Sequence, residues 1–387
     1  MISAAEKEEV QVDRVPFFVQ ATEVYTQRIS PKTEFLFVRV LTSNGVDGWG
    51  EGTFNSLNAQ VLPALQILAQ AIETKDAIDA LKFLSAQPCW KNGRAFRIAK
   101  NALEQAILDA EARVRQVPLF KLLGKQRRKT VPCYANINRG TKDRSTEGWA
   151  QRATAAISAG FNALKLAPFD GVSETGASKD RLTAASAGID ATKAVRAEIG
   201  NDPGLLLDCH WRFDLKSACG LIEQLRDASL FWIEAPILED YGNIPDLRAI
   251  REVANSSGIL LAGGEFHTGA RAFAPFLDQS VYNTINPDIR FCGIPDMVMV
   301  ADTAASKDVQ FSPHNHLGPV MTAASLHVMA IAPTAQMLEL QYAESDETTC
   351  IASPEQLMPV DGAMEVPTGH GLGIEIDTRA LSRVQLD

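Results

Sequence analysis

The chain has 387 residues, of which 46% are hydrophobic and 22% charged, and its formal net charge is −10 at pH 7. This composition is typical of a soluble globular protein, and the length allows two domains or one large barrel with additions. The negative charge argues against a nucleic-acid or anionic-membrane partner. No apolar run reaches the roughly 18 residues of a membrane span. The polar start MISAAEKEEVQVDR is unlike a secretory signal. The six cysteines lack CxxC spacing, which predicts a cytoplasmic protein with reduced thiols.

Residues 15–53 predict a small antiparallel sheet, and residues 57–125 predict helices. The first range is rich in β-branched and aromatic residues, and its turn SNGVDG contains an Asn-Gly pair that favours a hairpin. In the second range apolar residues recur at intervals of three and four, as on one helix face, until Pro118 and Gly124.

From about residue 131 onward, short apolar runs alternate with amphipathic segments. Eight such runs match the eight strands of a (β/α)₈ barrel. The alternative is a doubly wound sheet, but that fold usually has fewer strands and a Gly-rich phosphate turn, and no GxGxxG follows any run. The sequence therefore favours a barrel, with residues 351–387 packing back on the N-terminal part. The runs are 131–138, 161–169, 205–211, 230–237, 259–265, 282–289, 309–314 and 336–341.

Polar residues stand at the ends of these runs, where barrel enzymes carry their chemistry. Asp208, Glu234 and Glu265 end three consecutive runs, so their carboxylates should converge. Converging carboxylates repel unless they are protonated or share a cation, and an all-oxygen set suits Mg²⁺ best. Any one of these residues alone is more often a cap or an ion-pair partner, but their joint placement favours a function. The other polar residues at run ends are Lys165, His210, Asp288, His314, His316 and Glu339.

The stretch LLLDCHWRFD (205–214) places Asp208 and His210 two residues apart at the end of an apolar run. In an extended strand, residues i and i+2 project to the same side. The spacing therefore predicts that the carboxylate and the imidazole share one face of the strand.

Several motifs stand in a fixed order along the chain: GWGEGT (48–53), NALEQAILDAEARVRQVPLFKLLG (101–124), GFNALKL (160–166), LDCH (207–210), FWIEAP (231–236), GGE (263–265), NPDI (286–289), SPHNHLGP (312–319), PTAQMLEL (333–340) and GLGIEID (371–377). In this order and spacing the chain resembles the enolase superfamily, and within it the mandelate racemase subgroup. The resemblance implies a modified TIM (β/α)₇β barrel with an N-terminal α+β capping domain that the C-terminal segment completes. The expected division is a capping domain at 1–130, a catalytic barrel at 131–350 and a segment at 351–387 that packs back on the cap.

The family reaction implied by this resemblance begins with removal of the proton α to a carboxylate. Such a carbon acid is weak, so a cation must stabilise the charge on the carboxylate oxygens and a base must lie beside the α-carbon. The resemblance implies that Mg²⁺ binds Asp208, Glu234 and Glu265, that Asp288 and His314 form an Asp–His dyad, and that Glu339 hydrogen-bonds the enolate.

One departure from the subgroup narrows the expected reaction. Many members carry Lys-x-Lys at the end of the second strand, but this chain reads Lys165-Leu166-Ala167, which argues against a two-base racemase. His210 can instead protonate a departing β-hydroxyl, a pattern closest to galactonate dehydratase and related acid-sugar dehydratases. The expected activity is Mg²⁺-dependent dehydration of a sugar acid, an aldonate or aldarate, to a 2-keto-3-deoxy acid. Lys165 and Arg212 are expected to contact the substrate or neutralise charge, and His316 to touch the substrate.

Other functions remain open at this level. A sugar-acid lactone cycloisomerase or an epimerase would use the same base and metal, and a non-catalytic barrel with a regulatory or binding role is a third alternative. The presence of every ligand and both histidines argues against the third. The loops near 25–33 and 54–60 are expected to set substrate preference, and a homo-oligomer is expected.

Overall fold

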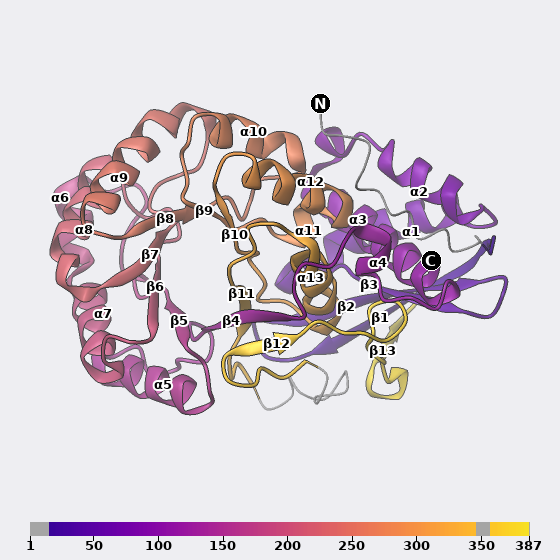
Figure 1. Cartoon of the computed structure of the whole chain (residues 1–387), viewed down its shortest axis with the longest axis horizontal. Helices are drawn as coiled ribbons and strands as arrows, with labels where there is room; N and C mark the ends of the chain where they lie inside the picture. The colour runs from indigo at the N-terminus through magenta and orange to yellow at the C-terminus, as the bar shows by residue number, and fades with distance from the viewer. Residues whose placement is uncertain (1–14, 346–356, 387) are drawn as a thin grey trace.

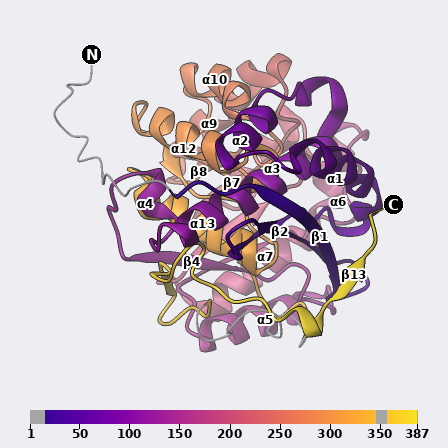
Figure 2. The same cartoon turned by 90° about the vertical axis from the view of Figure 1, so that its right-hand side faces the viewer.

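A computed structural model describes residues 15–345 and 357–386 and shows a cap and a barrel (Figures 1 and 2). The cap contains an antiparallel sheet with strands in the order β13-β1-β2-β3, and its helices lie in the range predicted for them. The strands are β1 (Val19–Arg28), β2 (Glu34–Thr42), β3 (Asp47–Glu51) and β13 (Ser382–Val384), and the helices are α1 (Asn58–Ile72), α2 (Ala77–Ser85), α3 (Cys89–Val114) and α4 (Phe120–Leu123).

The central strand β2 turns one face to the cap helices and the other to the barrel. Leu36, Val38 and Val40 are fully buried in a core shared with the cap helices. Phe35 and Phe37, on the opposite face, belong to the large core that fills the barrel part. This alternation is the period of two expected for a strand that is buried on both faces.

Strand β3 brings the cap close to the barrel. A Cβ at Gly50 would lie 1.9 Å from a carbonyl oxygen of α3, so only glycine lets β3 pack this closely against the cap helix α3. The next residue, Glu51, is buried and accepts hydrogen bonds from the backbone N–H groups of Gly318 (2.9 Å) and Met321 (3.1 Å) at the start of α13 (Pro319–Ile331). A carboxylate is favourable at a helix N-terminus, so Glu51 ties the cap sheet to the barrel.

All eight predicted runs form parallel strands of one curled sheet, in the order β10-β9-β8-β7-β6-β5-β4-β11. The ring closes where Phe311 of β10 forms a parallel bridge with Ala335, just before β11. Helices follow the first seven strands, and no α-helix follows β11 within the described residues, which confirms the (β/α)₇β arrangement. The strands are β4 (Thr130–Asn136), β5 (Ala163–Leu166), β6 (Gly204–Asp208), β7 (Leu230–Glu234), β8 (Leu260–Gly263), β9 (Thr284–Ile285), β10 (Gln310–Phe311) and β11 (Leu338–Gln341). The helices before α13 are α5 (Thr146–Ser158), α6 (Ser178–Ala184), α7 (Ser186–Ile199), α8 (Leu215–Gln224), α9 (Ile244–Ser256), α10 (Ala270–Asp278), α11 (Ile289–Cys292) and α12 (Ile294–Ala305).

The expectation of a strand through residue 211 is wrong. Strand β6 ends at Asp208, and His210 and Trp211 have left-handed backbone conformations, with φ of 46° and 58°. The backbone turns there because the N–H of Trp211 donates to the carbonyl of Ala235 (2.7 Å) in the loop after β7. His210 therefore belongs to a turn, and the period-two argument does not apply to it.

The C-terminal segment contacts both parts of the molecule. Strand β12 (Ala363–Glu365) pairs with β4 of the barrel, and β13 pairs with β1 and completes the cap sheet as expected. Cys350 and the predicted boundary at 350/351 lie outside the described residues, so the division at 130 and 350 stays a prediction.

The five described cysteines are free thiols, and four of them are buried. Each helix within residues 15–345 and 357–386 is too short or too polar to cross a bilayer.

Candidate active site

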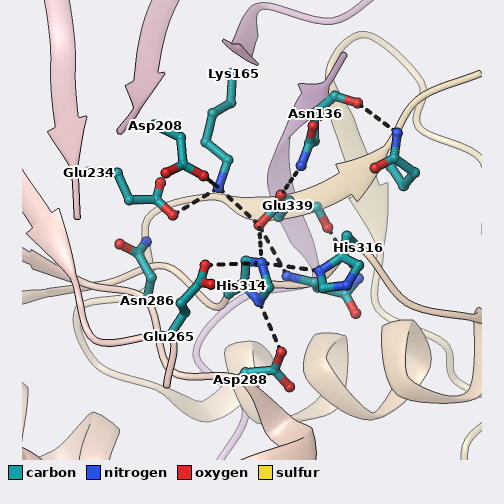
Figure 3. A network of polar contacts seen from close by, with 12 residues as sticks. Asn136, Lys165, Asp208, Glu234, Glu265, Asn286, Asp288, His314, His316 and Glu339 are labelled. Atoms are coloured by element: carbon teal, nitrogen blue, oxygen red, sulfur yellow. Dashed lines mark hydrogen bonds and ion pairs between the residues drawn. The ribbon is translucent and has the colours of Figure 1, made fainter. Parts of the chain in front are cut away.

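Seven of the eight barrel strands deliver an ionisable side chain to one end of the barrel (Figure 3). The strand register pairs Asp208, the last residue of β6, with Glu234, the last residue of β7. Glu265 follows the end of β8 by two residues. The remaining side chains come from Lys165 on β5, Asp288 after β9, His314 after β10 and Glu339 on β11.

The carboxylates of Asp208, Glu234 and Glu265 form a buried cluster in which one oxygen of each lies within 4.8 Å of the others. The ammonium Nζ of Lys165, also buried, lies 2.9 Å from Glu234 Oε1 and 3.7 Å from Asp208 Oδ2. Burial raises the pKa of Glu234 to about 8 even though Lys165 opposes the shift. Burial also disfavours the charged form of Lys165, but the carboxylates of Glu234 and Glu339 outweigh it and raise the pKa of that ammonium well above its usual value.

This donor set fits a hard divalent cation. Every ligand atom is a carboxylate oxygen, the ligand type that Mg²⁺ prefers. Asn286 lies beside Glu234 and Glu265 in Figure 3, and its buried Oδ1 has no hydrogen-bond partner among the described residues. A buried acceptor without a partner is uncommon, and a hydrated cation beside it would supply one.

Asp288 and His314 form the expected pair. His314 Nδ1 lies 2.9 Å from Asp288 Oδ2, and both side chains are buried. The guanidinium of Arg290 also binds Asp288, with Nε at 2.9 Å and Nη2 at 2.6 Å from Oδ2. Burial would raise the pKa of Asp288, but Arg290 and His314 hold it below its usual value, so the carboxylate stays ionised.

The other ring nitrogen of His314, Nε2, is surrounded by polar groups. It lies 3.2 Å from Glu265 Oε2, 3.8 Å from Glu339 Oε2 and 3.1 Å from the Nδ1 atom of His316. Burial would lower the pKa of His314, but the charges of Glu265, Glu339 and Asp288 raise it to about 9. Nε2 is therefore a strongly basic site next to the carboxylate cluster.

Asp288, His314 and His316 also have the spacing of a metal site. Arg290 argues against a cation there, because its guanidinium already contacts both carboxylate oxygens of Asp288. A metal bound to Asp288 would lie next to a fixed positive charge.

His210 reaches the carboxylate cluster from its turn. Its Nε2 lies 3.0 Å from Asp208 Oδ2, and its backbone N–H donates to Asp208 Oδ1 at 2.9 Å. The predicted proximity of the two side chains is thus present, although a turn and not a shared strand face produces it. Burial would lower the pKa of His210, but Asp208 raises it to about 9, so the imidazole is protonated near pH 7.

Glu339 is held by several donors. Asn136 Nδ2 donates to Glu339 Oε1 at 2.5 Å, while the Tyr134 hydroxyl and the Asn315 backbone N–H donate to Oε2, each at 3.2 Å. Lys165 Nζ lies 3.3 Å from the same oxygen. Burial would raise the pKa of Glu339, but Lys165, His314 and Asn136 lower it below its usual value, so this acid is ionised.

A cavity of about 410 Å³ opens onto these groups. The cap contributes residues 54–57, the first part of the loop 54–60 that was expected to set substrate preference. The other expected loop, 25–33, is absent from the lining, and the Arg212 guanidinium donates to the Val172 carbonyl at 2.7 Å instead of lining the cavity. Besides residues 54–57, the lining consists of Asn136, Asn138, Arg139, Asp208, His210, Trp211, Glu265, Phe266, Arg290, Phe291, His314 and His316.

Sequence reasoning missed several of these groups. Asn136 ends β4 and Arg290 follows Asp288 by two residues, so the rule that strand ends carry the chemistry could have found both. Arg139 and Phe266 stand in loops, where no periodic pattern marks them.

The chain matches two family models. The model described as "Enolase C-terminal domain-like" matches residues 148–380, and "Mandelate racemase / muconate lactonizing enzyme, N-terminal domain" matches residues 6–124. Together they cover most of the cap and the barrel but not residues 125–147, which contain β4.

Two relatives and two solved structures resemble the chain over most of its length. D-gluconate dehydratase of Thermoproteus tenax is 28% identical over 359 residues, covering 91% of this chain and 70% of that protein. D-galactonate dehydratase of Xanthomonas axonopodis pv. citri is 27% identical over 374 residues, covering 94% of each. The structure of an enolase-superfamily member from Salmonella Typhimurium has a TM-score of 0.83 at 23% identity, covering 95% of this chain and 100% of that one. The structure of a mandelate racemase/muconate lactonizing enzyme from Sulfitobacter sp. has a TM-score of 0.81 at 23% identity, covering 94% of each.

The solved structures share the fold, and the family models cover both parts of the chain in the order found here. The chain therefore belongs to the enolase superfamily, within its mandelate racemase / muconate lactonizing enzyme group, and is an enzyme.

Proposed function

We propose that this enzyme is a Mg²⁺-dependent dehydratase that converts a sugar acid into a 2-keto-3-deoxy acid. The observation that carries the proposal is a pair of histidines in the lining of one cavity, each bound to its own carboxylate. His314 contacts Asp288 at 2.9 Å, and His210 contacts Asp208 at 3.0 Å. A base and an acid are the two groups that elimination of water requires. The names of the D-gluconate and D-galactonate dehydratases agree with this reaction class.

The proposed metal ligands are Asp208, Glu234 and Glu265. A Mg²⁺ ion bound there would stabilise the negative charge that develops on the substrate carboxylate when the α-proton leaves. A cation on Glu265 would also offset the largest charge that raises the pKa of His314. The neutral imidazole would then be more populated near pH 7, as a base requires.

His314 is the proposed base, and Nε2 is the atom that takes the C2 proton. Asp288 accepts a hydrogen bond from Nδ1, which leaves the lone pair on Nε2, and it stabilises the imidazolium once the proton has moved. Glu339 is proposed to hydrogen-bond the enolate, which requires its protonated form, and negative charge developing on the substrate beside it would favour that form.

His210 is the proposed acid. Asp208 and Glu265 favour the protonated imidazole, and a cation bound at these carboxylates would offset part of that effect; the protonated form can give its proton to the C3 hydroxyl, which leaves as water. The remaining enol then tautomerises to the 2-keto-3-deoxy acid.

Lys165 is proposed to neutralise the carboxylate cluster. Its pKa lies well above the usual value because of Glu234 and Glu339, so it holds its proton and is a poor base. Position 167, where many subgroup members carry a second lysine, is a buried alanine. With one base, racemisation through two opposed bases is disfavoured.

The test is a screen of aldonates and aldarates with Mg²⁺ for formation of 2-keto acids. Dehydration of at least one sugar acid is the expected result. Opening of lactones without dehydration of any acid would support the cycloisomerase alternative instead. A cytoplasmic location and a homo-oligomeric state remain part of the proposal.

A further inference from the structure

One cation in the cavity lining is neither part of the Asp–His pair nor next to the carboxylate cluster. Arg139 lies in the loop between β4 and α5, and its side chain is 20% exposed. The other arginine of the lining, Arg290, is already bound to Asp288 through Nε and Nη2. Arg139 is therefore the arginine of this lining whose charge is available to a substrate.

Two segments far apart in the sequence hold Arg139 in place. Its Nη1 donates to the Thr33 hydroxyl of the cap at 2.6 Å and lies 3.5 Å from Glu344 Oε2 after β11. The other carboxylate oxygen of Glu344 accepts hydrogen bonds from the hydroxyls of Ser30 and Thr33, both at 2.6 Å. The hydrogen bonds that Glu344 accepts from Ser30 and Thr33 are shorter than its 3.5 Å contact with Arg139. Glu344 therefore offsets the charge of the Arg139 guanidinium only in part.

The opposite edge of the guanidinium carries no hydrogen bond. Within the described part of the chain, Nε and Nη2 of Arg139 have no hydrogen-bond partner, and the side chain as a whole is 20% exposed. Those two N–H groups point in parallel and match the two oxygens of a carboxylate. Burial lowers the pKa of Arg139, which means that its charge is poorly solvated and that an anion beside it would be favoured.

We propose that Arg139 binds a second carboxylate of the substrate, so that the preferred substrate is a sugar diacid, an aldarate. The inference rests on the proposed function, in which the first carboxylate lies at the cluster of Asp208, Glu234 and Glu265. It goes beyond the relatives, whose names specify aldonates. The 25–33 segment then acts on specificity indirectly, because Thr33 positions the arginine without lining the cavity.

The experiment compares kcat/KM for aldonates with kcat/KM for aldarates of the same configuration. A hydrogen-bonded ion pair in a cavity favours the diacid by about 10- to 100-fold. Arg139→Gln should remove this preference by raising KM for the diacid by a much larger factor than KM for the aldonate. Arg139→Lys, which keeps the charge but cannot offer two parallel N–H groups, should retain only part of the preference. The control is Arg226→Gln, since Arg226 is an exposed arginine that pairs with Glu223 and does not line the cavity.

Two results would overturn the inference. One is a wild-type enzyme that uses aldonates as well as the matched aldarates, and the other is an equal loss for both substrates in Arg139→Gln, which would mark a structural role. Calorimetric binding of both acids to His314→Asn, with and without Arg139→Gln, measures the same contact without turnover. If no sugar acid is dehydrated but the diacid still binds through Arg139, the proposed function fails and the binding site stands.

Discussion

His316 Nδ1 lies 3.1 Å from His314 Nε2, and the far nitrogen of His316 lies 3.3 Å from Asn55 Nδ2 in the cap. Burial, with Arg139 and His314, holds the pKa of His316 well below its usual value, so this imidazole is neutral. If Asn55 Nδ2 donates to His316 Nε2, the proton of the neutral His316 ring lies on Nδ1, where it can donate to His314 Nε2 whenever that nitrogen is unprotonated, the form that takes the C2 proton. The cap loop is thereby linked to the proposed base through one side chain.

The first prediction concerns this link. His316→Phe keeps an aromatic ring but removes both hydrogen bonds, so His314 should lose part of its orientation. We expect kcat to fall by about 2- to 10-fold, the value of one net hydrogen bond, with a smaller change in KM. Steady-state kinetics measure kcat and KM, and His370→Phe, a change at an exposed position, is the control. A change confined to KM would show that His316 contacts the substrate and does not orient the base.

The second prediction concerns the carboxylate cluster. Glu234→Gln removes one charge from the three converging carboxylates, and Mg²⁺ affinity should fall by at least the roughly 10- to 100-fold seen when groups supporting a metal ligand are lost. Isothermal titration calorimetry with Mg²⁺ measures this directly. Glu223→Gln, an exposed glutamate on α8, should bind Mg²⁺ as the wild type does.

Activity gives a separate test of the same cluster. A chelator should abolish turnover, and added Mg²⁺ should restore it. Full activity in excess chelator would contradict the assignment of Asp208, Glu234 and Glu265 as metal ligands.

The third prediction separates the two histidines of the site. His314→Asn should lose both exchange of the C2 proton with solvent and dehydration, by at least about 10² to 10⁴-fold. His210→Asn should still exchange the C2 proton in deuterated water but form little keto acid, because the hydroxyl would have to leave as hydroxide. NMR follows the exchange and a keto-acid assay follows the product.

Each outcome for His210→Asn has a clear meaning. Near wild-type dehydration would make His210 a structural residue. Loss of exchange as well would place His210 in proton removal and reopen the cycloisomerase and epimerase alternatives.

The fourth prediction concerns Glu51, the buried carboxyl between cap and barrel. Burial raises its pKa to about 7, against the opposing hydrogen bonds from Thr53, Met321 and Gly318. The folded state therefore binds the proton more tightly than the unfolded state. The stability that this group contributes is full below its unfolded pKa of about 4.5 and is lost as pH rises through 7.

The Glu51→Gln variant has no titratable group at this position, so its stability should not fall in this way as pH rises through 7. The difference in unfolding free energy between wild type and variant should change by at most ~3 kcal/mol between pH 4.5 and 8. Urea unfolding at several pH values measures this difference. The contributions of the other buried carboxyls cancel because both proteins contain them. A pH-independent difference would show that Glu51 has an ordinary pKa.

The sequence predicted the eight barrel strands because each is a short buried run bounded by helical segments. It also predicted that Asp208, Glu234 and Glu265 lie close together, because parallel strands end at a common edge. It failed where the backbone leaves regular structure. His210 reaches Asp208 through two left-handed residues, and no periodic pattern predicts such a turn.

Loop side chains were harder to place from the sequence. Arg212 was expected to contact the substrate or neutralise charge, but its guanidinium donates to the Val172 carbonyl. Arg139 was not singled out, although it lines the cavity. Which way a long side chain points from a loop depends on partners such as Thr33 and Glu344 that lie far away in the sequence.

The pairing of β1 with β13 has a consequence for how the molecule is made. Val24 pairs with Val384, so the cap sheet joins the first and the last strands of the described chain. On the ribosome, β1, β2 and β3 emerge first, while the outer edge of β1 keeps its unpaired backbone groups until β13 is released. At typical synthesis rates this delay is roughly 20 to 70 seconds, during which an open strand edge can pair with another nascent chain. The barrel can close before β13 exists, so the cap sheet is the part whose assembly must wait until residues 382–384 have been synthesised.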